Sequence, residues 1–205
     1  MTDFSRHPLP GIIIFGLVIV SAITLLYFMP KGAEVVFFQK THTPLTNQLM
    51  LWITRLAEWP VITPMMLLIF VKRGKKGALI AGLSLILLSF FIQALKHSLP
   101  EFPRPVQSFQ SLGILSLPAW ELHHHHSFPS GHTASAAALY LMLYYFFSGS
   151  RSLILCTLAW GGVAISRMYL LQHFLSDVSV GLLIGFVFSL PVLVYTIRKK
   201  TVHNG

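Results

Sequence analysis

The sequence predicts an all-α protein, a polytopic membrane bundle of about six transmembrane helices with one interfacial helix. Three observations indicate this fold: 54% of the 205 residues are hydrophobic, only 10% are charged, and the mean hydropathy is +0.69. Several apolar runs also approach the roughly 20 residues that a helix needs to cross about 30 Å of hydrocarbon. We expect one integral membrane domain that comprises residues 1–205.

The apolar runs indicate where the helices lie. Residues 9–29 follow a single Arg6 and lack a small-residue cleavage site, so this run is predicted to be a retained helix rather than a signal peptide. Residues 31–59 place Trp52, Arg55, Glu58 and Trp59 at the spacing of an interfacial helix. Further spans are expected at residues 60–71, 77–95, 131–148, 152–170 and 175–197.

The distribution of Lys and Arg predicts the orientation of these spans. An inside N-terminus places nine of the 15 cations in the cytoplasm: Arg6, Lys72, Arg73, Lys75, Lys76, Arg151, Arg198, Lys199 and Lys200. The other six are Lys31, Lys40, Arg55, Lys96, Arg104 and Arg167. We therefore expect a multi-pass protein of the bacterial inner membrane, with residues 97–128 on the periplasmic side.

The formal charge of +9 indicates contact with anionic lipid headgroups, because the basic residues cluster at helix ends. The expected partner is thus the lipid bilayer, and binding of nucleic acid is not expected. The single cysteine, Cys156, lies inside an apolar run, where it is interpreted as a small core residue rather than a nucleophile.

Three polar clusters stand at the ends of the apolar runs. They comprise Lys96 with Arg104-Pro105, then Pro129-Ser130-Gly131-His132, then Ser166-Arg167 with His173 and Asp177. The predicted orientation puts all three on one side of the membrane, which favours a single composite site. Phosphate chemistry explains such a grouping, because guanidinium groups match phosphate oxygens and a helix N-terminus attracts anions.

The first two clusters also have a simpler interpretation. Lys96 alone could be an anchor that extends to the interface, whereas Arg104 between two prolines belongs to a rigid loop. Ser130 could be an ordinary helix cap, with Gly131 allowing close approach of an anion. His173 and Asp177 are four residues apart, so they are expected on one helical face, where the carboxylate orients the ring.

In residue type and order the clusters resemble the tripartite signature of the type 2 phosphatidic acid phosphatase superfamily, which also contains glucose 6-phosphatases and vanadium haloperoxidases. The resemblance covers the chain from Gly77 onward, with the motifs within residues 96–177. One departure is the spacing of Lys96 from Arg104, which is one residue longer than the usual pattern.

The resemblance implies a role for each motif residue. His173 would form a phosphohistidine, Asp177 would orient it, and His132 would protonate the leaving oxygen and later activate water. The phosphate oxygens would be held by Lys96, Arg104, Ser130, Gly131 and Arg167. No metal and no cofactor are implied.

The implied function is that of a membrane lipid phosphatase acting on a lipid monophosphate or diphosphate. Undecaprenyl diphosphate, phosphatidic acid, phosphatidylglycerophosphate and lipid A phosphates are the candidate substrates, and undecaprenyl diphosphate or a related lipid is favoured among them. Two alternatives are a lipid phosphotransferase with the same intermediate and a non-catalytic protein that binds anionic lipids. A haloperoxidase is disfavoured because those enzymes resemble soluble proteins.

Two further stretches have alternative interpretations. The run from His123 to His126 could bind a transition metal or form a solvated loop. The aromatic stretch from Tyr140 to Phe147 is expected to be lipid-facing and packing surface rather than a cofactor site.

Overall fold

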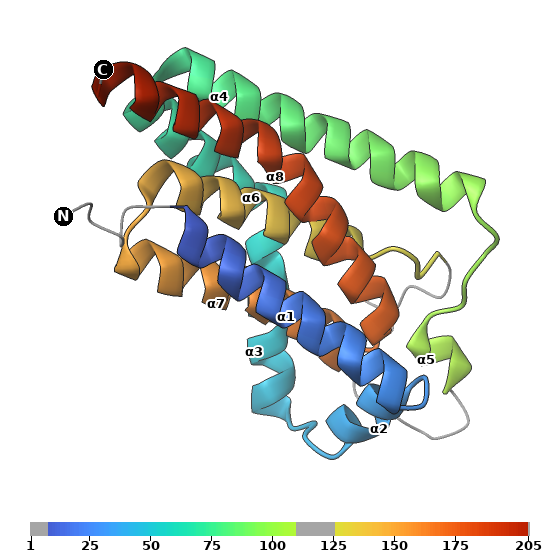
Figure 1. Cartoon of the computed structure of the whole chain (residues 1–205). Coiled ribbons are helices and arrows are strands. Elements are labelled where there is room, and N and C mark those ends of the chain that lie inside the picture. The colour runs from blue at the N-terminus through green and yellow to red at the C-terminus, as the bar shows by residue number, and fades with distance from the viewer. Residues whose placement is uncertain (1–7, 110–125, 205) are drawn as a thin grey trace.

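The computed structural model describes residues 8–109 and 126–204, and within them every regular element is a helix (Figure 1). The prediction of an all-α fold is confirmed. The elements in chain order are α1 (Leu9–Phe28), α2 (Ala33–Gln39), α3 (Pro44–Thr54), the short 3-10 helix η2 (Arg55–Ala57), α4 (Trp59–Ser98), α5 (Pro105–Ser108), α6 (Gly131–Phe147), α7 (Ser150–Tyr169) and α8 (Leu175–Asn204).

Helix α4 consists of two limbs that meet at Gly74. The backbone there has φ 79° and ψ 176°, a conformation that glycine adopts without steric cost. A Cβ built on Gly82 would lie 3.5 Å from Met66 Cε, so the limb before Gly74 packs against the limb after it. In Figure 1 these are the teal and green limbs. The spans predicted at 60–71 and 77–95 correspond to the two limbs.

Four helices in the described ranges are long and apolar enough to cross a membrane: α1, α4, α7 and residues Leu175–Lys199 of α8. The protein is therefore an integral membrane protein. Helix α6, predicted as a span, has 17 residues and is not among the four. The count of six spans stays a prediction. Residues 31–59 form α2, α3 and η2 instead of one helix, and their position at the headgroups is also still a prediction.

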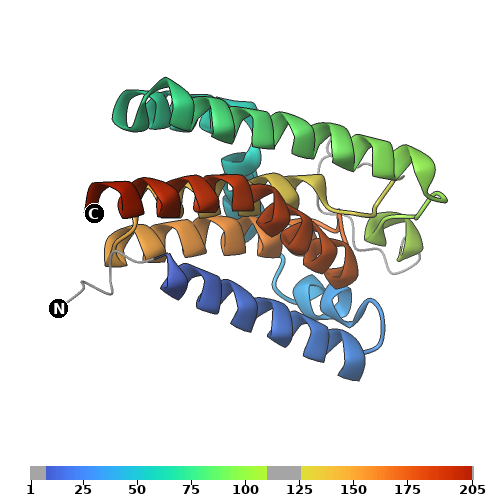
Figure 2. The ribbon, with the colours of Figure 1, turned by 45° about the horizontal axis from the view of Figure 1, so that its top comes forward.

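Helix α6 occupies the centre of the bundle, in contact with α4, α7 and α8. Figure 2 shows the long limb of α4 above the level of α6 and α8, with α7 and then α1 below. Because neighbours surround α6, its aromatic side chains pack inside the bundle. The expectation of packing surface agrees with this, whereas the expectation that they face lipid is wrong. The buried ones are Tyr140, Tyr144, Tyr145 and Phe146, whereas Phe147 is partly buried.

Helices α6 and α8 contact each other through their backbones. A Cβ on Gly181 would lie 2.6 Å from the carbonyl oxygen of Ser130, and one on Gly185 would overlap that of Ala134. Two glycines four residues apart form a small-residue stripe that allows such close helix packing in membranes. This contact joins the start of α6 to the first half of α8.

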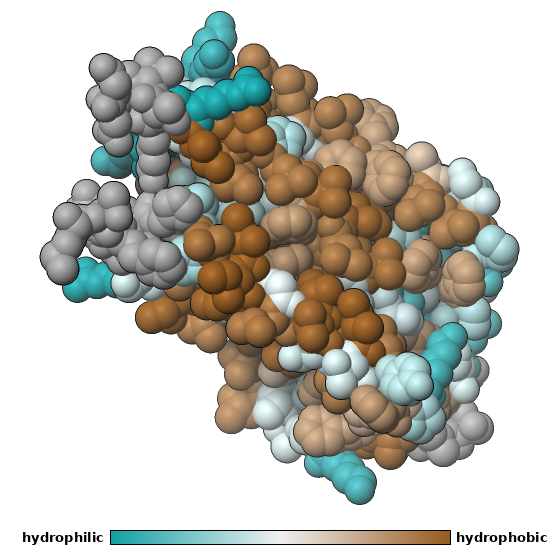
Figure 3. All heavy atoms as spheres, in the orientation of Figure 1, coloured by the Kyte–Doolittle hydropathy of each residue, from teal (hydrophilic) through white to brown (hydrophobic). Residues whose placement is uncertain are grey.

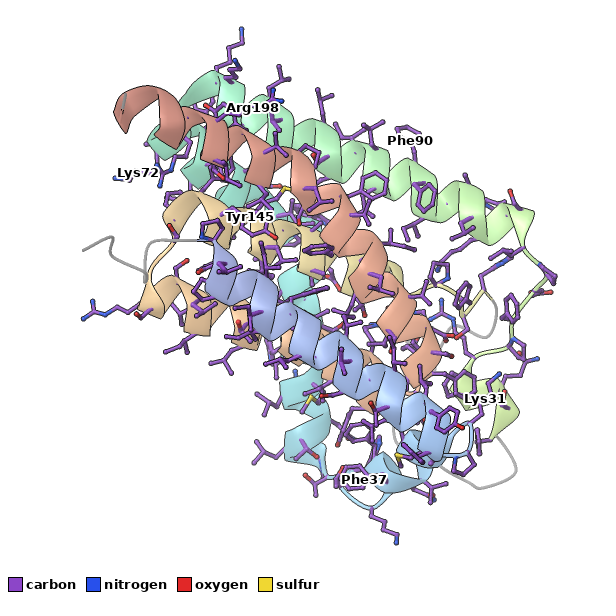
Figure 4. All side chains as sticks on the ribbon, viewed as in Figure 1. Lys31, Phe37, Lys72, Phe90, Tyr145 and Arg198 are labelled. Carbon is purple, nitrogen blue, oxygen red and sulfur yellow. The ribbon has the colours of Figure 1, made fainter. Side chains whose placement is uncertain are left out.

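The two ends of the bundle carry different groups. Lys72 and Arg198 lie at one end and Lys31 lies at the other (Figure 4). On the face that Figure 3 shows, the surface between the ends is mostly apolar. The first turns of α6 and α8 and the last turn of α7 lie at the end where α2 and α5 lie, so the three polar clusters share that end (Figure 1).

Candidate active site

A cavity of about 770 Å³ collects most of the residues that the sequence singled out. Its polar lining includes Lys96, Arg104, Gly131, His132, Arg167 and His173. Ser130 and Asp177 are buried next to this lining, at 0% and 4% exposure. The expectation of one composite site therefore agrees with the geometry, since residues from α4, α6, α7 and the loops reach a single space.

Both arginines are buried and hydrogen-bonded. Arg104, directly before α5, donates from Nη1 to Oε1 of Gln172 at 2.7 Å. Arg167, in the last turn of α7, donates from Nη1 to Oγ1 of Thr54 at 2.9 Å. Burial lowers the pKa of Arg104 to about 10, which leaves the guanidinium charged at neutral pH. Two fixed, dehydrated cations thus face the same cavity.

Lys96 is in the last turn of α4, where a cation interacts favourably with the helix dipole. Its Nζ donates to the carbonyl oxygen of His126 at 3.2 Å. Because the side chain lines the cavity, its position also suits phosphate binding. The longer spacing to Arg104 is taken up by residues 99–104, which are not helical.

Ser130 caps α6. Its Oγ accepts from the backbone N–H of Thr133 at 3.4 Å and lies 2.8 Å from Thr133 Oγ1. The Ser130 N–H donates to the carbonyl oxygen of Asp177 at 3.1 Å. Gly131, the first residue of α6, lines the cavity, so the N-terminus of this helix points its dipole at whatever binds there.

His173 does not share a helical face with Asp177, which corrects the expectation from their spacing. Helix α8 begins at Leu175, so His173 lies in the turn before it. Asp177 lies in the first turn, where Oδ2 accepts from the N–H of Phe174 at 2.9 Å and from the Ser127 hydroxyl. Oδ2 is 3.7 Å from Nδ1 of His173, which is beyond hydrogen-bond distance but close enough for electrostatic attraction.

His173 is a neutral base in this setting. It is 2% exposed, and burial lowers its pKa to about 3, an effect that nearby Asp177 only partly opposes. At neutral pH the ring therefore keeps a free lone pair. Since Nδ1 lies toward Asp177, Nε2 is the nitrogen left to react with a molecule in the cavity.

Sequence reasoning did not assign several polar residues to this site: Thr54, Glu58, Ser127 and Gln172. Gln172 directly precedes His173, and this position next to a motif residue is a signal that could have assigned it to the site. Glu58 was placed only at the interface, although it is one of six acidic residues in the chain. Its Oε1 lies 3.5 Å from Nε2 of His132.

The histidine run lies mostly outside the described residues, which include only His126. The His126 ring lies 5.9 Å from that of His97, between ring centres. In residues 8–109 and 126–204 no group of three His, Cys, Asp or Glu side chains could hold a metal ion. The metal interpretation of residues 123–126 is thus still a prediction.

Sequence comparison identifies the family. The model of the PAP2 superfamily, the type 2 phosphatidic acid phosphatases, matches residues 77–201, which contain all three polar clusters. The chain belongs to the PAP2 superfamily. This match confirms the resemblance noted from the motifs. Among curated proteins no sequence match is significant.

Two solved structures share the fold of this PAP2 protein. The crystal structure of Aquifex aeolicus LpxE has a TM-score of 0.63 and 24% identity, over 77% of this chain and 90% of that one. The transmembrane PAP2-type phosphatidylglycerolphosphate phosphatase from Bacillus subtilis has a TM-score of 0.63 and 21% identity, over 94% of this chain and 96% of that one. At these identities the similarity establishes the fold alone.

Proposed function

We propose that this PAP2 protein is a membrane lipid phosphatase that hydrolyses a lipid monophosphate or diphosphate through a phosphohistidine. The observation that supports this most directly is the meeting of neutral, buried His173 with His132 and two buried arginines in one cavity. A nucleophile, a second proton-transfer group and fixed positive charge are what phosphoryl transfer needs.

In the first step Nε2 of His173 attacks phosphorus. The N–P bond forms as the bond from phosphorus to the leaving oxygen breaks, and protonated His132 transfers its proton to that oxygen. The imidazole ring becomes positively charged while it carries the phosphoryl group. Asp177, 3.7 Å from Nδ1, stabilises this charge and favours the tautomer with the proton on Nδ1.

In the second step water attacks the phosphohistidine. His132, now neutral, accepts a proton from the water, the N–P bond breaks, and inorganic phosphate leaves. Both histidines return to their starting protonation states. The two steps therefore balance as hydrolysis of one phosphate bond.

The phosphoryl oxygens are held by Lys96, Arg104, Ser130, the Gly131 amide and Arg167. Arg104 and Arg167 need no rearrangement to meet the transition state because they are already fixed by Gln172 and Thr54. Ser130 can contribute only if its hydroxyl turns away from Thr133, with which it is now in contact. No metal is required in this scheme, so EDTA should leave the rate unchanged while vanadate should inhibit.

The substrate is proposed to be a lipid because the cavity opens at one end of a membrane bundle. One of the two structural neighbours is a phosphatidylglycerolphosphate phosphatase, which supports this class. We place the protein, as one domain, in the bacterial inner membrane, with the cavity on the periplasmic side. The clustering of Lys72 and Arg198 at the opposite end supports this orientation (Figure 4).

The test uses the purified full-length protein with a panel of lipid monophosphates and diphosphates, and it measures released phosphate. We expect wild-type protein to hydrolyse at least one lipid and His173→Ala to have no measurable activity, with His97→Ala as the control. Exposed His97 lies outside the cavity lining. Retention of about a tenth of the rate by His173→Ala would contradict the proposal.

The same assay separates the alternatives. A phosphotransferase would pass label from a donor lipid to an added acceptor lipid, with little free phosphate. A non-catalytic protein would bind anionic lipid equally well with and without His173 and release no phosphate.

A further inference from the structure

Glu58 is the only carboxylate that lines the cavity in the described part of the chain. It directly precedes α4, and its Oε1 lies 3.5 Å from Nε2 of His132. This distance allows an ion pair whenever the ring is protonated. Both side chains are 38% exposed, so the pair is accessible from the cavity and is not part of the buried core.

The other charges around His132 have the opposite sign. The cationic side chains that line the same cavity are Arg55, Lys96, Arg104 and Arg167, and His173 also faces it. Their positive charge suits a phosphoryl group but repels a protonated His132. Glu58 opposes this repulsion at close range. It is therefore the described side chain best placed to favour the form of His132 that can donate a proton.

The proposed reaction also brings the leaving group close to Glu58. In the proposed reaction His132 protonates the leaving oxygen, so that oxygen must come within about 3 Å of the ring. With His132 and Glu58 in contact, the leaving group then lies beside the carboxylate as well. The charge and basicity of the leaving group decide whether Glu58 makes its departure easier or harder.

The two substrate classes differ in this respect. A phosphomonoester expels an alkoxide, a strong base that needs the proton from His132 and departs as a neutral alcohol. A lipid diphosphate expels a lipid monophosphate, a weak base that can leave without protonation and carries negative charge toward Glu58. The carboxylate thus assists the first reaction and repels the product of the second.

We infer that Glu58 is a specificity-determining residue that makes lipid phosphomonoesters better substrates than lipid diphosphates. This inference rests on the proposed function and narrows its substrate class. It differs from the sequence-based preference for undecaprenyl diphosphate or a related lipid. The motif residues could not separate the two classes, because they hold only the phosphate that both classes share.

The experiment compares farnesyl phosphate with farnesyl diphosphate, which differ only in the leaving group. Purified wild-type protein, Glu58→Gln and Glu101→Gln are assayed in detergent, and the lipid products are separated to obtain kcat/KM for each. Glu101 is an exposed carboxylate that does not line the cavity, so its change to Gln controls for the loss of one charge.

We expect wild-type protein to prefer the monophosphate. Glu58→Gln should lower kcat/KM for the monophosphate by about tenfold or more and change that for the diphosphate by no more than about threefold. Glu58→Asp, which keeps the charge, should retain part of the preference and thereby exclude a folding defect. Glu101→Gln should show the wild-type ratio.

Three results would overturn the inference: a wild-type preference for the diphosphate, an equal loss on both compounds in Glu58→Gln, or an unchanged ratio in that variant. Each of them leaves the phosphatase assignment in place, because phosphate is still released. If wild-type protein released none from any lipid, the proposed function itself would fail.

Discussion

The carboxylate of Glu34 accepts a hydrogen bond from the backbone N–H of Leu175 at 2.9 Å. This bond links α2 to the first residue of α8, two positions after His173. Close by, Lys31 Nζ lies 4.7 Å from the centre of the Phe174 ring, and Val35 packs with Leu171 and Phe174. Helix α2 and Lys31, just before it, therefore support the turn that carries His173.

Glu34→Ala should weaken this support. One N–H at the start of α8 loses its acceptor, so we expect a loss of about 1 kcal/mol in stability and a lower kcat with little change in KM. Glu34→Gln keeps an acceptor oxygen and should be milder. Thermal unfolding in detergent and steady-state kinetics measure both effects, with exposed Glu101→Ala as the control. Equal behaviour of Glu34→Ala and the control would show that the bond is unimportant.

Arg104→Lys and Arg167→Lys should each reduce kcat/KM by roughly one to three orders of magnitude, since lysine keeps the charge but lacks the planar fork. The hydrogen bonds to Gln172 and Thr54 would also be altered. Lys96→Arg should be milder. Exposed Arg151, at the opposite end of α7, provides the matched control as Arg151→Lys. If neither Arg104→Lys nor Arg167→Lys lowered kcat/KM, phosphate would have to bind elsewhere.

Acid should destabilise the protein in part through His173. In the folded state its pKa is about 3, against 6.5 in the unfolded chain, so between these values the unfolded state binds more protons. This contribution to stability is complete above pH 6.5 and is lost as the pH falls toward 3. His173→Asn should therefore show a shallower fall in Tm across this range than wild-type protein. Exposed His97→Asn should follow the wild-type curve.

The fold class and most of the site could be predicted because both depend on local sequence. Apolar length indicates membrane helices, and Ser130-Gly131 before an apolar run indicates a helix start. The spacing of four residues could not predict how His173 lies relative to Asp177. Helix α8 begins only at Leu175, whose N–H donates to Glu34, so His173 lies outside the helix. Glu58 and Thr54 were missed because only tertiary packing brings them to His132 and Arg167.

The predicted orientation can be tested with single cysteines in a Cys156→Ala background, as Cys156 is the only native one. Ser108→Cys and Lys75→Cys place exposed thiols near α5 and the turn of α4. A membrane-impermeant reagent on intact cells should label position 108 and leave position 75 unlabelled. The reverse pattern would put the cavity on the cytoplasmic side and remove lipids of the outer leaflet from the candidate substrates.

The glycine contact between α6 and α8 has a consequence for motion. Gly181 and Gly185 bring the two backbones so close that one helix cannot slide past the other without steric overlap. The segments carrying His132 and Asp177 are thereby kept in a constant relative position, also through the bond from Ser130 to Asp177. We therefore expect any widening of the cavity to come from its other wall, formed by α3, η2 and α4, and not from a shift of α6 against α8. Such a widening would carry Thr54 and Glu58 with it, while the start of α6 and the start of α8 kept their relative position.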